Sequence, residues 1–488
     1  MTEQKSSDPA VQAYQLMCAG KLLAALPLAE QAVAGQHTCL PVHGMLATLL
    51  LQLGRATDAE VVVARALELR QGSADAYDAL AHVSMLLGDH ERSNALYRRA
   101  VDLAPNDPRF LYNLASSERS FGRLVEAEAA CDKAITLNSA QYATYLLRSE
   151  LRVQSQDQNH IAELKSQLSG SNLSDRARAL LGYALAKELD DLRQYDAAFH
   201  WFSEAARSRR KQLVYDVALD ERKLQRIQEV FPKQPVRSSF ADSDSKRFVF
   251  IIGLPRSGTT LLEHILTGLP AVRSNGETEN FSRALMAAAP VVRGDVFSCA
   301  AAAPPGVVAA NYARFANATS THEVIIEKLP MNYLYLGAIH NALPQAKLLL
   351  VRRAPLDSCF AMYRTLFGVA YPFSYDFEDL ARYYAAYDRL VAHWRDSFGD
   401  AMHEVEYEEL VKSPASVGAG VARYCGLEWQ EQAVDVHKSA SVSYTASAAQ
   451  IRRPIYGSSS GRWRHYRKHL EPLVRALRQH GVTPPEDA

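Results

Sequence analysis

The sequence predicts a multidomain chain in which an all-α repeat solenoid precedes an α/β domain with a parallel sheet. Three observations lead to this fold class. Glycines recur every 34 residues in the first part of the chain, a period typical of stacked helical pairs. In the second half, short apolar segments alternate with helical ones, as they do in parallel α/β sheets. A glycine-containing loop follows the first of these apolar segments, where such domains hold phosphate groups.

The repeat is carried by glycine and alanine. The periodic glycines are Gly20, Gly54, Gly88 and Gly122. Twelve residues after each stands an alanine, giving Ala32, Ala66, Ala100 and Ala134. Each unit predicts a helix that ends at a glycine turn and a second, antiparallel helix whose small alanine permits close packing. The pattern resembles the tetratricopeptide repeat. Because one helical pair cannot bury its own apolar face, the units should stack into a solenoid whose concave groove binds a protein or peptide.

Two further segments set the expected domain boundaries. Residues 140–175 look like a degenerate repeat, and YALAKELDDLRQYDAAFHWFSEAARSRR indicates one more, looser helical pair, so we expect the repeat domain over residues 1–211. Residues 212–245 combine a charged helical stretch with a polar segment containing proline and serine, which predicts a helix and a linker. Residues 246–488 then form the α/β domain, with strands expected at RFVFII, at VIIE (324–327) and at AKLLLV (346–351).

The loop after the first expected strand has the composition of a phosphate site. It reads Gly253, Leu254, Pro255, Arg256, Ser257, Gly258, Thr259, Thr260, and the helical segment LLEHILTGL follows. Its backbone amides and the helix N-terminus would both face an anion. The length matches the triphosphate-binding loop GxxxxGK[ST], but Thr259 stands in place of the lysine, which disfavours a triphosphate. Arg256 supplies a cation instead, and no metal is expected.

This loop resembles the 5′-phosphosulfate loop of sulfotransferases, in particular the tyrosylprotein sulfotransferases and bacterial repeat-containing relatives. The resemblance covers roughly residues 246–480. It implies an enzyme that transfers a sulfuryl group from 3′-phosphoadenosine 5′-phosphosulfate (PAPS) to a hydroxyl acceptor. It also implies that the donor binds residues 255–260 of the loop, namely Pro255, Arg256, Ser257, Gly258, Thr259 and Thr260.

The resemblance extends to the catalytic groups. VRSNGET (272–278) resembles an element whose glutamate is the general base, which assigns Glu277 to deprotonation of the acceptor hydroxyl. Glu279 is a competing candidate. His264 is a weaker one, because we expect it on an exposed face of the helix after the loop. Lys328, at the end of VIIEK, resembles a lysine that stabilises the bridging oxygen during transfer.

A second element, AKLLLVRRAPLDSCFAMYRTLF, resembles the motif that binds the 3′-phosphate, an arginine followed eight residues later by a serine. Counting from Arg353 places Asp357 where the family often has aspartate, so Arg353 is preferred to Arg352. Position 361 is alanine, so the hydroxyl contact is lost unless Ser358, one helical turn earlier, replaces it.

Later residues complete the expected site by resemblance alone. Tyr407 resembles a tyrosine that contacts the nucleotide. In SAAQIRRPIYGSSSGRWRHY, Ser447 would stabilise the transition state and Gln450 would lie near the nucleotide. In the same stretch Arg462, which precedes a tryptophan, would contact a phosphate.

Composition limits the partners. The 488 residues carry 54 basic and 54 acidic side chains, which gives no support for binding nucleic acid or an anionic membrane. We expect a cytoplasmic protein, because the sequence shows no secretory signal and no apolar run of about 18 residues. The acceptor stays open between a protein tyrosine and carbohydrate or small-molecule hydroxyls. Two alternatives to an active transferase also stay open: a repeat scaffold whose second domain binds nucleotide without turnover, and a P-loop kinase.

Overall fold

A computed structural model of the chain describes residues 8–35, 39–69, 72–170, 172–232, 247–289, 295–316, 324–368, 370–436, 455 and 460–484. The chain forms two compact units, Met1–Leu151 and Arg152–Ala488.

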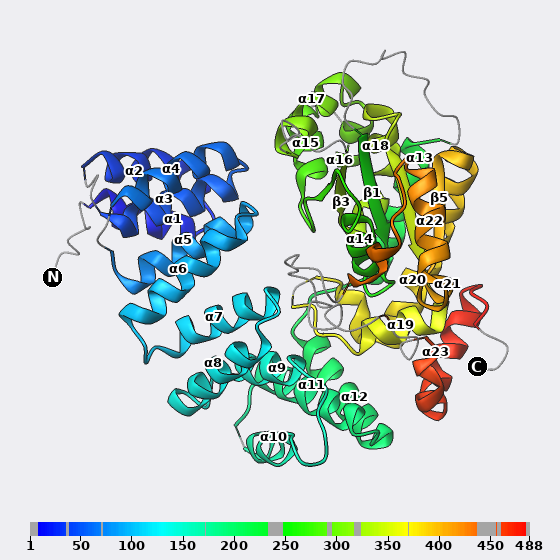
Figure 1. Ribbon diagram of the computed structural model, residues 1–488, viewed down its shortest axis with the longest axis horizontal. Coiled ribbons are helices and arrows are strands. Elements are labelled where there is room, and N and C mark those ends of the chain that lie inside the picture. Colours follow the sequence, from blue (N-terminus) through cyan, green and yellow to red (C-terminus); the bar gives the residue numbers. More distant parts are fainter. Residues whose placement is uncertain are drawn as a thin grey trace. The chain divides into compact units, whose positions relative to one another are not determined.

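The first unit consists of helical hairpins (Figure 1, blue to cyan). In chain order the helices are α1 (Pro9–Cys18), α2 (Leu22–Gly35), α3 (Leu40–Gln52), α4 (Ala56–Glu68), α5 (Ala74–Leu86), α6 (His90–Leu103), α7 (Pro108–Ser120), α8 (Leu124–Leu137) and α9 (Tyr142–Glu150). Each predicted glycine lies between the two helices of a hairpin, with φ between +71° at Gly20 and +84° at Gly88. The left-handed region costs glycine little, so each turn is tight. The four periodic alanines are buried, and the predicted repeat is confirmed.

The second unit begins with helices α10 (Ile161–Leu168), α11 (Asp175–Asp191), α12 (Tyr195–Lys211) and α13 (Val217–Val230). The looser helical pair expected from the sequence is the hairpin α11–α12. Its turn places Arg193 at φ 59°, where the clear repeats have glycine. The two helices approach so closely that a Cβ atom on Gly182 would lie 2.9 Å from Ala205 Cβ. This hairpin belongs to the same compact unit as the sheet, while the boundary expected at residue 211 stays a prediction.

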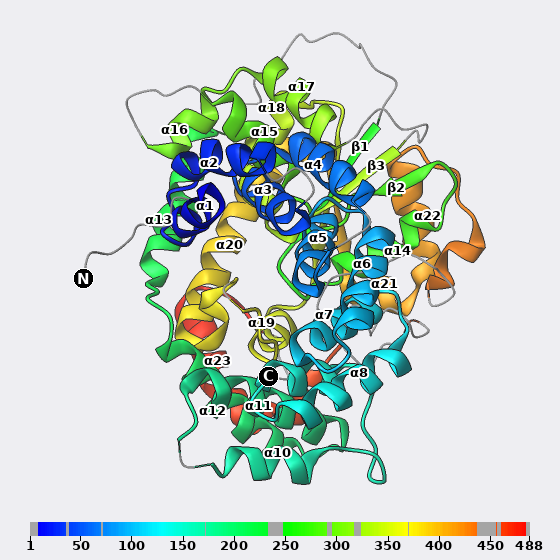
Figure 2. The ribbon, with the colours of Figure 1, turned by 90° about the vertical axis from the view of Figure 1, so that its left-hand side faces the viewer.

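A five-stranded parallel sheet forms the centre of this unit. Its strands are β1 (Arg247–Gly253), β2 (Val272–Ser274), β3 (Val324–Lys328), β4 (Lys347–Arg352) and β5 (Met402–Glu406), and they lie in the order β2-β3-β1-β4-β5. Figure 2 shows β2, β3 and β1 together. The apolar side chains of β1, β3 and β4 pack with those of α14 and α22 in one core. The predicted α/β class with a parallel sheet is confirmed.

Helices and short 3-10 turns surround the sheet. They are α14 (Thr259–Thr267), α15 (Asn280–Ala288), α16 (Val296–Ala301), α17 (Pro305–Phe315), η1 (Pro330–Tyr335), α18 (Leu336–Ala342), α19 (Pro355–Tyr363), η2 (Pro372–Tyr375), α20 (Phe377–Phe398), η3 (Gly399–Ala401), α21 (Tyr407–Lys412), α22 (Pro414–Tyr424), η4 (Glu431–Val434), η7 (Arg462–Tyr466) and α23 (Arg467–Gln479). None of the helices in the described part of the chain combines the length and apolar character needed to cross a membrane.

Candidate functional site

The expected site residues gather at one edge of the sheet. The chain leaves β1 at Gly253 and passes directly into the glycine loop, while Glu277 follows β2 and Lys328 ends β3. Arg353 follows β4, and Tyr407 follows β5. Because all neighbouring strands are parallel, their carboxyl ends meet at the same edge, which is where open α/β sheets bind ligands. The register agrees, since Lys328 lies opposite Ile251, two residues before the loop begins.

The glycine loop has the backbone of an anion site. Gly258 caps helix α14 with φ 106°, and Arg256 also has a positive φ, 66°. Pro255, Thr259 and Thr260 are buried, and Arg256 is half-buried. The Oγ atom of Ser257 is buried and has no hydrogen-bond partner among the described residues. A loop that opens onto a helix N-terminus with an unsatisfied hydroxyl suits a phosphate-bearing ligand.

Arg353 and Tyr407 brace this loop from the neighbouring strands. A Cβ atom at position 258 would lie 2.3 Å from Cδ2 of Tyr407, so only glycine fits beside the ring. The guanidinium carbon of Arg353 lies 4.8 Å from the centroid of the same ring. Arg353 also donates a hydrogen bond of 3.0 Å from Nη1 to the carbonyl oxygen of Arg256. These contacts place both predicted residues against the predicted loop.

Arg352 turns away from the loop. Its Nη2 atom lies 2.9 Å from a carboxylate oxygen of Asp388, and its Nη1 atom lies 3.7 Å from one of Glu404. Ser358 lines a small pocket that Arg353 also lines. Arg352 lines this pocket too, so the register counted from Arg353 is favoured by the contact of Arg353 with the loop and not by the pocket.

Glu277 and Lys328 form an ion pair. The Nζ atom of Lys328 donates to Oε1 of Glu277 over 2.6 Å, and the lysine side chain is 0% exposed whereas the glutamate side chain is 38% exposed. Glu263, in α14, forms a second ion pair with the same ammonium, with its Oε2 atom 3.5 Å from Nζ of Lys328. Its other oxygen accepts a 2.5 Å hydrogen bond from the hydroxyl of Ser274. The site therefore has a buried cation between two carboxylates, one of them open to solvent.

Glu263 was not among the residues expected from the sequence. The available signal was a carboxylate inside the otherwise apolar segment TTLLEHIL, and such a buried charge normally has a partner. Glu279, the competing base, is exposed at the N-cap position of α15, where its carbonyl accepts a hydrogen bond from the Arg283 amide.

The expectation for His264 is wrong. This histidine is buried, and its Nδ1 atom lies 2.9 Å from the carbonyl oxygen of Thr260. The reason is that α14 packs against both the sheet and α22, so the face expected to be exposed is covered.

A second buried carboxylate, Glu327, precedes Lys328 in β3. Its Oε1 atom accepts hydrogen bonds from the Phe281 amide (3.3 Å) and from Nδ2 of Asn332 (3.2 Å), which ties β3 to α15 and η1. Burial raises the pKa of Glu327 to about 7, although these hydrogen bonds act in the opposite direction. Successive side chains of a strand point to opposite faces, so Glu327 supports the elements around the site from the side opposite to Lys328.

Three expected residues come from the last part of the chain. Ser447 and Gln450 lie outside the described residues. Arg462 opens η7, and its guanidinium pairs with the carboxylate of Asp190 in α11. The side chain of Arg462 stays partly exposed.

The chain resembles known proteins in both halves. Residues 249–431 match the sulfotransferase family, and residues 16–83 and 79–142 match tetratricopeptide repeats. An uncharacterized protein of Aquifex aeolicus (strain VF5) is 28% identical over 399 residues, which are 79% of this chain and 52% of that protein. The chain thus spans about half the length of this curated relative.

Similar solved structures include two sulfotransferase domains. The domain from the Synechococcus PCC 7002 olefin synthase is 20% identical with a TM-score of 0.35, over 46% of this chain and 91% of that one. The domain from the curacin biosynthetic pathway is 15% identical with a TM-score of 0.36, over 50% of this chain and 100% of that one. From the family matches, the chain combines tetratricopeptide repeats with a domain of the sulfotransferase family.

Proposed function

We propose that residues 246–488 catalyse the transfer of a sulfuryl group from PAPS to a hydroxyl acceptor. The observation that carries this proposal is the ion pair of Lys328 and Glu277 at the edge of the sheet where the glycine loop begins. The match of residues 249–431 to the sulfotransferase family supports it.

The donor would bind along the carboxyl edge of the strands. The backbone amides that follow Pro255 in the loop and the N-terminus of α14 suit the 5′-phosphosulfate. Arg353, with Ser358 in the helix that follows it, suits the 3′-phosphate, and the ring of Tyr407 packs against the loop at Gly258. The resemblance adds Gln450 and Arg462 to the nucleotide contacts.

The transfer step would use Glu277 as the base. Its carboxylate takes the acceptor proton while a bond forms between the acceptor oxygen and sulfur. The bond between sulfur and the bridging oxygen of the 5′-phosphate breaks, and 3′-phosphoadenosine 5′-phosphate leaves. Lys328 would stabilise the charge that develops on the bridging oxygen, and Ser447 would assist it by resemblance. A fully buried ammonium is suited to this task because little water competes with it.

We further propose a tyrosine hydroxyl on a protein as the acceptor, recruited through the repeats. The resemblance to tyrosylprotein sulfotransferases and the concave surface that stacked repeats form both favour it. Glu277 is the more exposed member of the ion pair, so an acceptor can reach the base from solvent.

The test has two parts. Calorimetry of the full chain with 3′-phosphoadenosine 5′-phosphate should show binding without added metal, and ATP with magnesium should bind far more weakly. Sulfur-labelled PAPS should then label an acceptor among tyrosine peptides, oligosaccharides and simple phenols. Tight binding of magnesium-ATP with no binding of 3′-phosphoadenosine 5′-phosphate would refute the proposal in favour of a kinase. Binding of the spent donor with no labelling of any acceptor would favour the inactive scaffold.

A further inference from the structure

Asp190, near the end of α11, is a buried carboxylate with three side-chain partners. Its Oδ2 atom accepts hydrogen bonds from Arg364 and Arg462, and its Oδ1 atom accepts one from the hydroxyl of Tyr466. The carboxylate side chain is 1% exposed. One carboxylate of the helical hairpin thus binds two arginines that come from separate segments of the α/β domain.

Both segments belong to the expected nucleotide site. Arg364 directly follows α19, the helix of the 3′-phosphate motif, and Arg462 opens η7. The two segments are also joined directly, since Asp357 of α19 accepts a 2.8 Å hydrogen bond from the amide of Gly461. The position of Arg462 relative to α19 is therefore determined by Asp357 through the backbone and by Asp190 through the side chain.

The cluster contains more arginines than carboxylates in direct contact with them. Two guanidinium groups share the carboxylate of Asp190, and the charge of Asp191 also acts on both of them. Burial opposes ionisation of Asp190, but the charges of Arg364 and Arg462 outweigh it and lower the pKa of this carboxyl. Burial lowers the pKa of Arg364. The side chains of Arg364 and Arg462 stay 18% and 29% exposed, so an anionic ligand can reach these cations.

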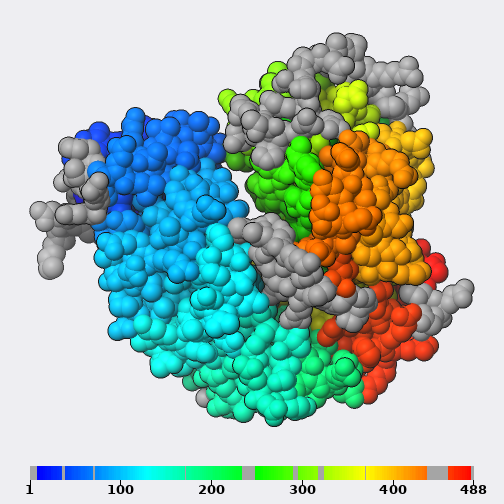
Figure 3. All heavy atoms as spheres, viewed as in Figure 1, coloured from blue at the N-terminus to red at the C-terminus, as the bar shows by residue number. Residues whose placement is uncertain are grey.

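The rest of the hairpin fixes the same C-terminal segment. The ring of Tyr195 stacks on His465 at 4.5 Å between centroids, and the ring of Phe199 stacks on His469 at 4.4 Å. In Figure 3 the red surface of this segment lies directly against the green surface of α12. Helix α12 of the hairpin therefore packs against η7 and α23 through stacked rings.

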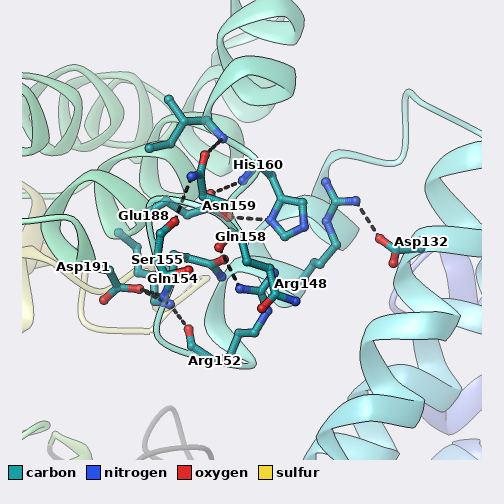
Figure 4. A network of polar contacts seen from close by, with 12 residues as sticks. Asp132, Arg148, Arg152, Gln154, Ser155, Gln158, Asn159, His160, Glu188 and Asp191 are labelled. Atoms are coloured by element: carbon teal, nitrogen blue, oxygen red, sulfur yellow. Dashed lines mark hydrogen bonds and ion pairs between the residues drawn. The ribbon is translucent and has the colours of Figure 1, made fainter.

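Helix α11 is itself held in place around Asp190. Figure 4 shows the preceding loop folded onto the helix. The buried carboxylate of Glu188 accepts a 2.6 Å hydrogen bond from the His160 amide, and Asp191 accepts one of 2.9 Å from the amide of Gln154. The acidic neighbours of Asp190 thus bind the loop, whereas Asp190 binds the α/β domain.

We propose that Asp190 is a positioning residue of the nucleotide site, which holds Arg462 in place for the 3′-phosphate of the donor. This inference rests on the proposed sulfotransferase function and adds a residue that lies outside the sulfotransferase-family match. The hairpin α11–α12 then belongs to the catalytic machinery, although its sequence resembles the repeats.

The test compares two nucleotides on the full-length protein. 3′-Phosphoadenosine 5′-phosphate and AMP differ only in the 3′-phosphate, so the ratio of their dissociation constants isolates that contact. In Asp190→Asn we expect affinity for the bisphosphate to fall by about tenfold or more while affinity for AMP stays within about twofold, because a charged hydrogen bond is lost at one phosphate only. Asp196→Asn is the matched control: its exposed carboxylate on the same hairpin pairs with Lys468 and His469 rather than with Arg364 or Arg462, so the variant should leave the comparison unchanged.

A milder variant covers the case in which Asp190→Asn does not fold. Tyr466→Phe removes one hydroxyl from the cluster and keeps every charge. It should also weaken binding of the bisphosphate relative to AMP, by a smaller factor than Asp190→Asn. An unchanged ratio in the folded variants would overturn the positioning role. A lower dissociation constant for the bisphosphate in Asp190→Asn would also overturn it, because Asp190 would then compete with the phosphate for Arg462. If the wild-type protein binds neither nucleotide, the proposed function itself fails, which is a separate outcome.

Discussion

The ammonium of Lys328 lies 2.6 Å from the carboxylate of Glu277 and joins the end of β3 to the loop after β2. The lysine is fully buried and the glutamate is partly exposed. In the proposed reaction, an acceptor that comes from solvent would meet Glu277 first, with the more deeply buried Lys328 behind it.

Glu277→Gln should abolish transfer and leave the dissociation constant of 3′-phosphoadenosine 5′-phosphate within a few fold. The substitution removes basicity and keeps the shape and a hydrogen-bond acceptor for Lys328. Calorimetry and an initial-rate assay with labelled PAPS measure the two quantities. Glu279→Gln is the control, since this glutamate is exposed at the N-cap position of α15. If instead Glu279→Gln loses activity and Glu277→Gln keeps it, the base is assigned to the wrong residue.

Arg353→Ala should weaken nucleotide binding more than Arg352→Ala. Arg353 is buried against the loop and donates to the carbonyl of Arg256, whereas Arg352 is bound to Asp388. A charged hydrogen bond to phosphate contributes about 1.5 to 3 kcal/mol, so the loss should be about tenfold or more in the dissociation constant. Calorimetry on the two variants decides the order, and a larger loss in Arg352→Ala would shift the register by one residue.

Gly258→Ala should prevent nucleotide binding. The new Cβ would lie 2.3 Å from the Tyr407 ring, at a residue with φ 106°, so either the loop or the tyrosine must move. Gly481→Ala is a suitable control, because Gly481 also has a positive φ, 81°, but no atom lies within 4 Å of a Cβ there. We expect the control to lose stability by about 1 kcal/mol from backbone strain alone and to keep nucleotide affinity. Normal affinity in Gly258→Ala would show that the loop is not held as described.

The parts of the fold that repeat or form long apolar runs were predictable. The glycines of the repeat hold positive φ angles at their expected places, and β1, β3 and β4 are the three expected strands. Strand β2 has three residues, too few for an alternation of apolar and polar side chains to be recognised. The α/β class followed from local pattern, which a single sequence carries.

Side-chain pairing was much less predictable. Asp190 and Asp191 are adjacent in the sequence, yet their side chains project from different faces of the helix. Asp190 pairs with Arg462, whereas Asp191 accepts a hydrogen bond from the Gln154 amide. Glu263 meets Lys328 only because α14 folds back along the sheet. Contacts of this kind join residues far apart in the chain, and no local pattern records them.

Glu327 should make the stability of the α/β unit depend on pH. Its pKa rises from an ordinary value of 4.5 to about 7 in the folded chain. Between these values the folded protein keeps the proton that the unfolded chain has released. The contribution of this group to stability is therefore fully present below about pH 4.5 and is lost as the pH rises to about 7. Glu327→Gln removes this dependence. Relative to wild type, the variant should gain up to about 3 kcal/mol between pH 5 and pH 8.

Thermal unfolding of both proteins at the two pH values measures this effect. The midpoint temperature of the variant minus that of wild type should be larger at pH 8 than at pH 5. Since the amide oxygen introduced by Glu327→Gln can still accept the hydrogen bonds from Phe281 and Asn332, the hydrogen bonds of the site are preserved. An identical gap at both pH values would mean that Glu327 does not bind a proton in this range.

Removing the first compact unit should impair a protein acceptor and spare a minimal one. The cut belongs after Leu151, because α11 and α12 pack within the second unit and carry Asp190. Joining a groove to a catalytic domain raises the effective concentration of a tethered substrate. The truncated protein should therefore show a raised KM for a protein acceptor, with the KM of a short tyrosine peptide within about twofold of the full chain.

A second truncation tests whether the hairpin α11–α12 acts with the repeats or with the nucleotide site. Deleting residues 1–210 also removes the hairpin and with it Asp190, so this shorter protein should lose nucleotide affinity as well as acceptor affinity. Thermal stabilisation by 3′-phosphoadenosine 5′-phosphate, which must accompany binding to the native state, is measured on both truncations before any kinetics. Equal KM values for long and short acceptors in the stabilised 1–151 deletion would exclude recruitment by the repeats. Stabilisation of both truncations to the same extent would show that the hairpin is dispensable for the nucleotide.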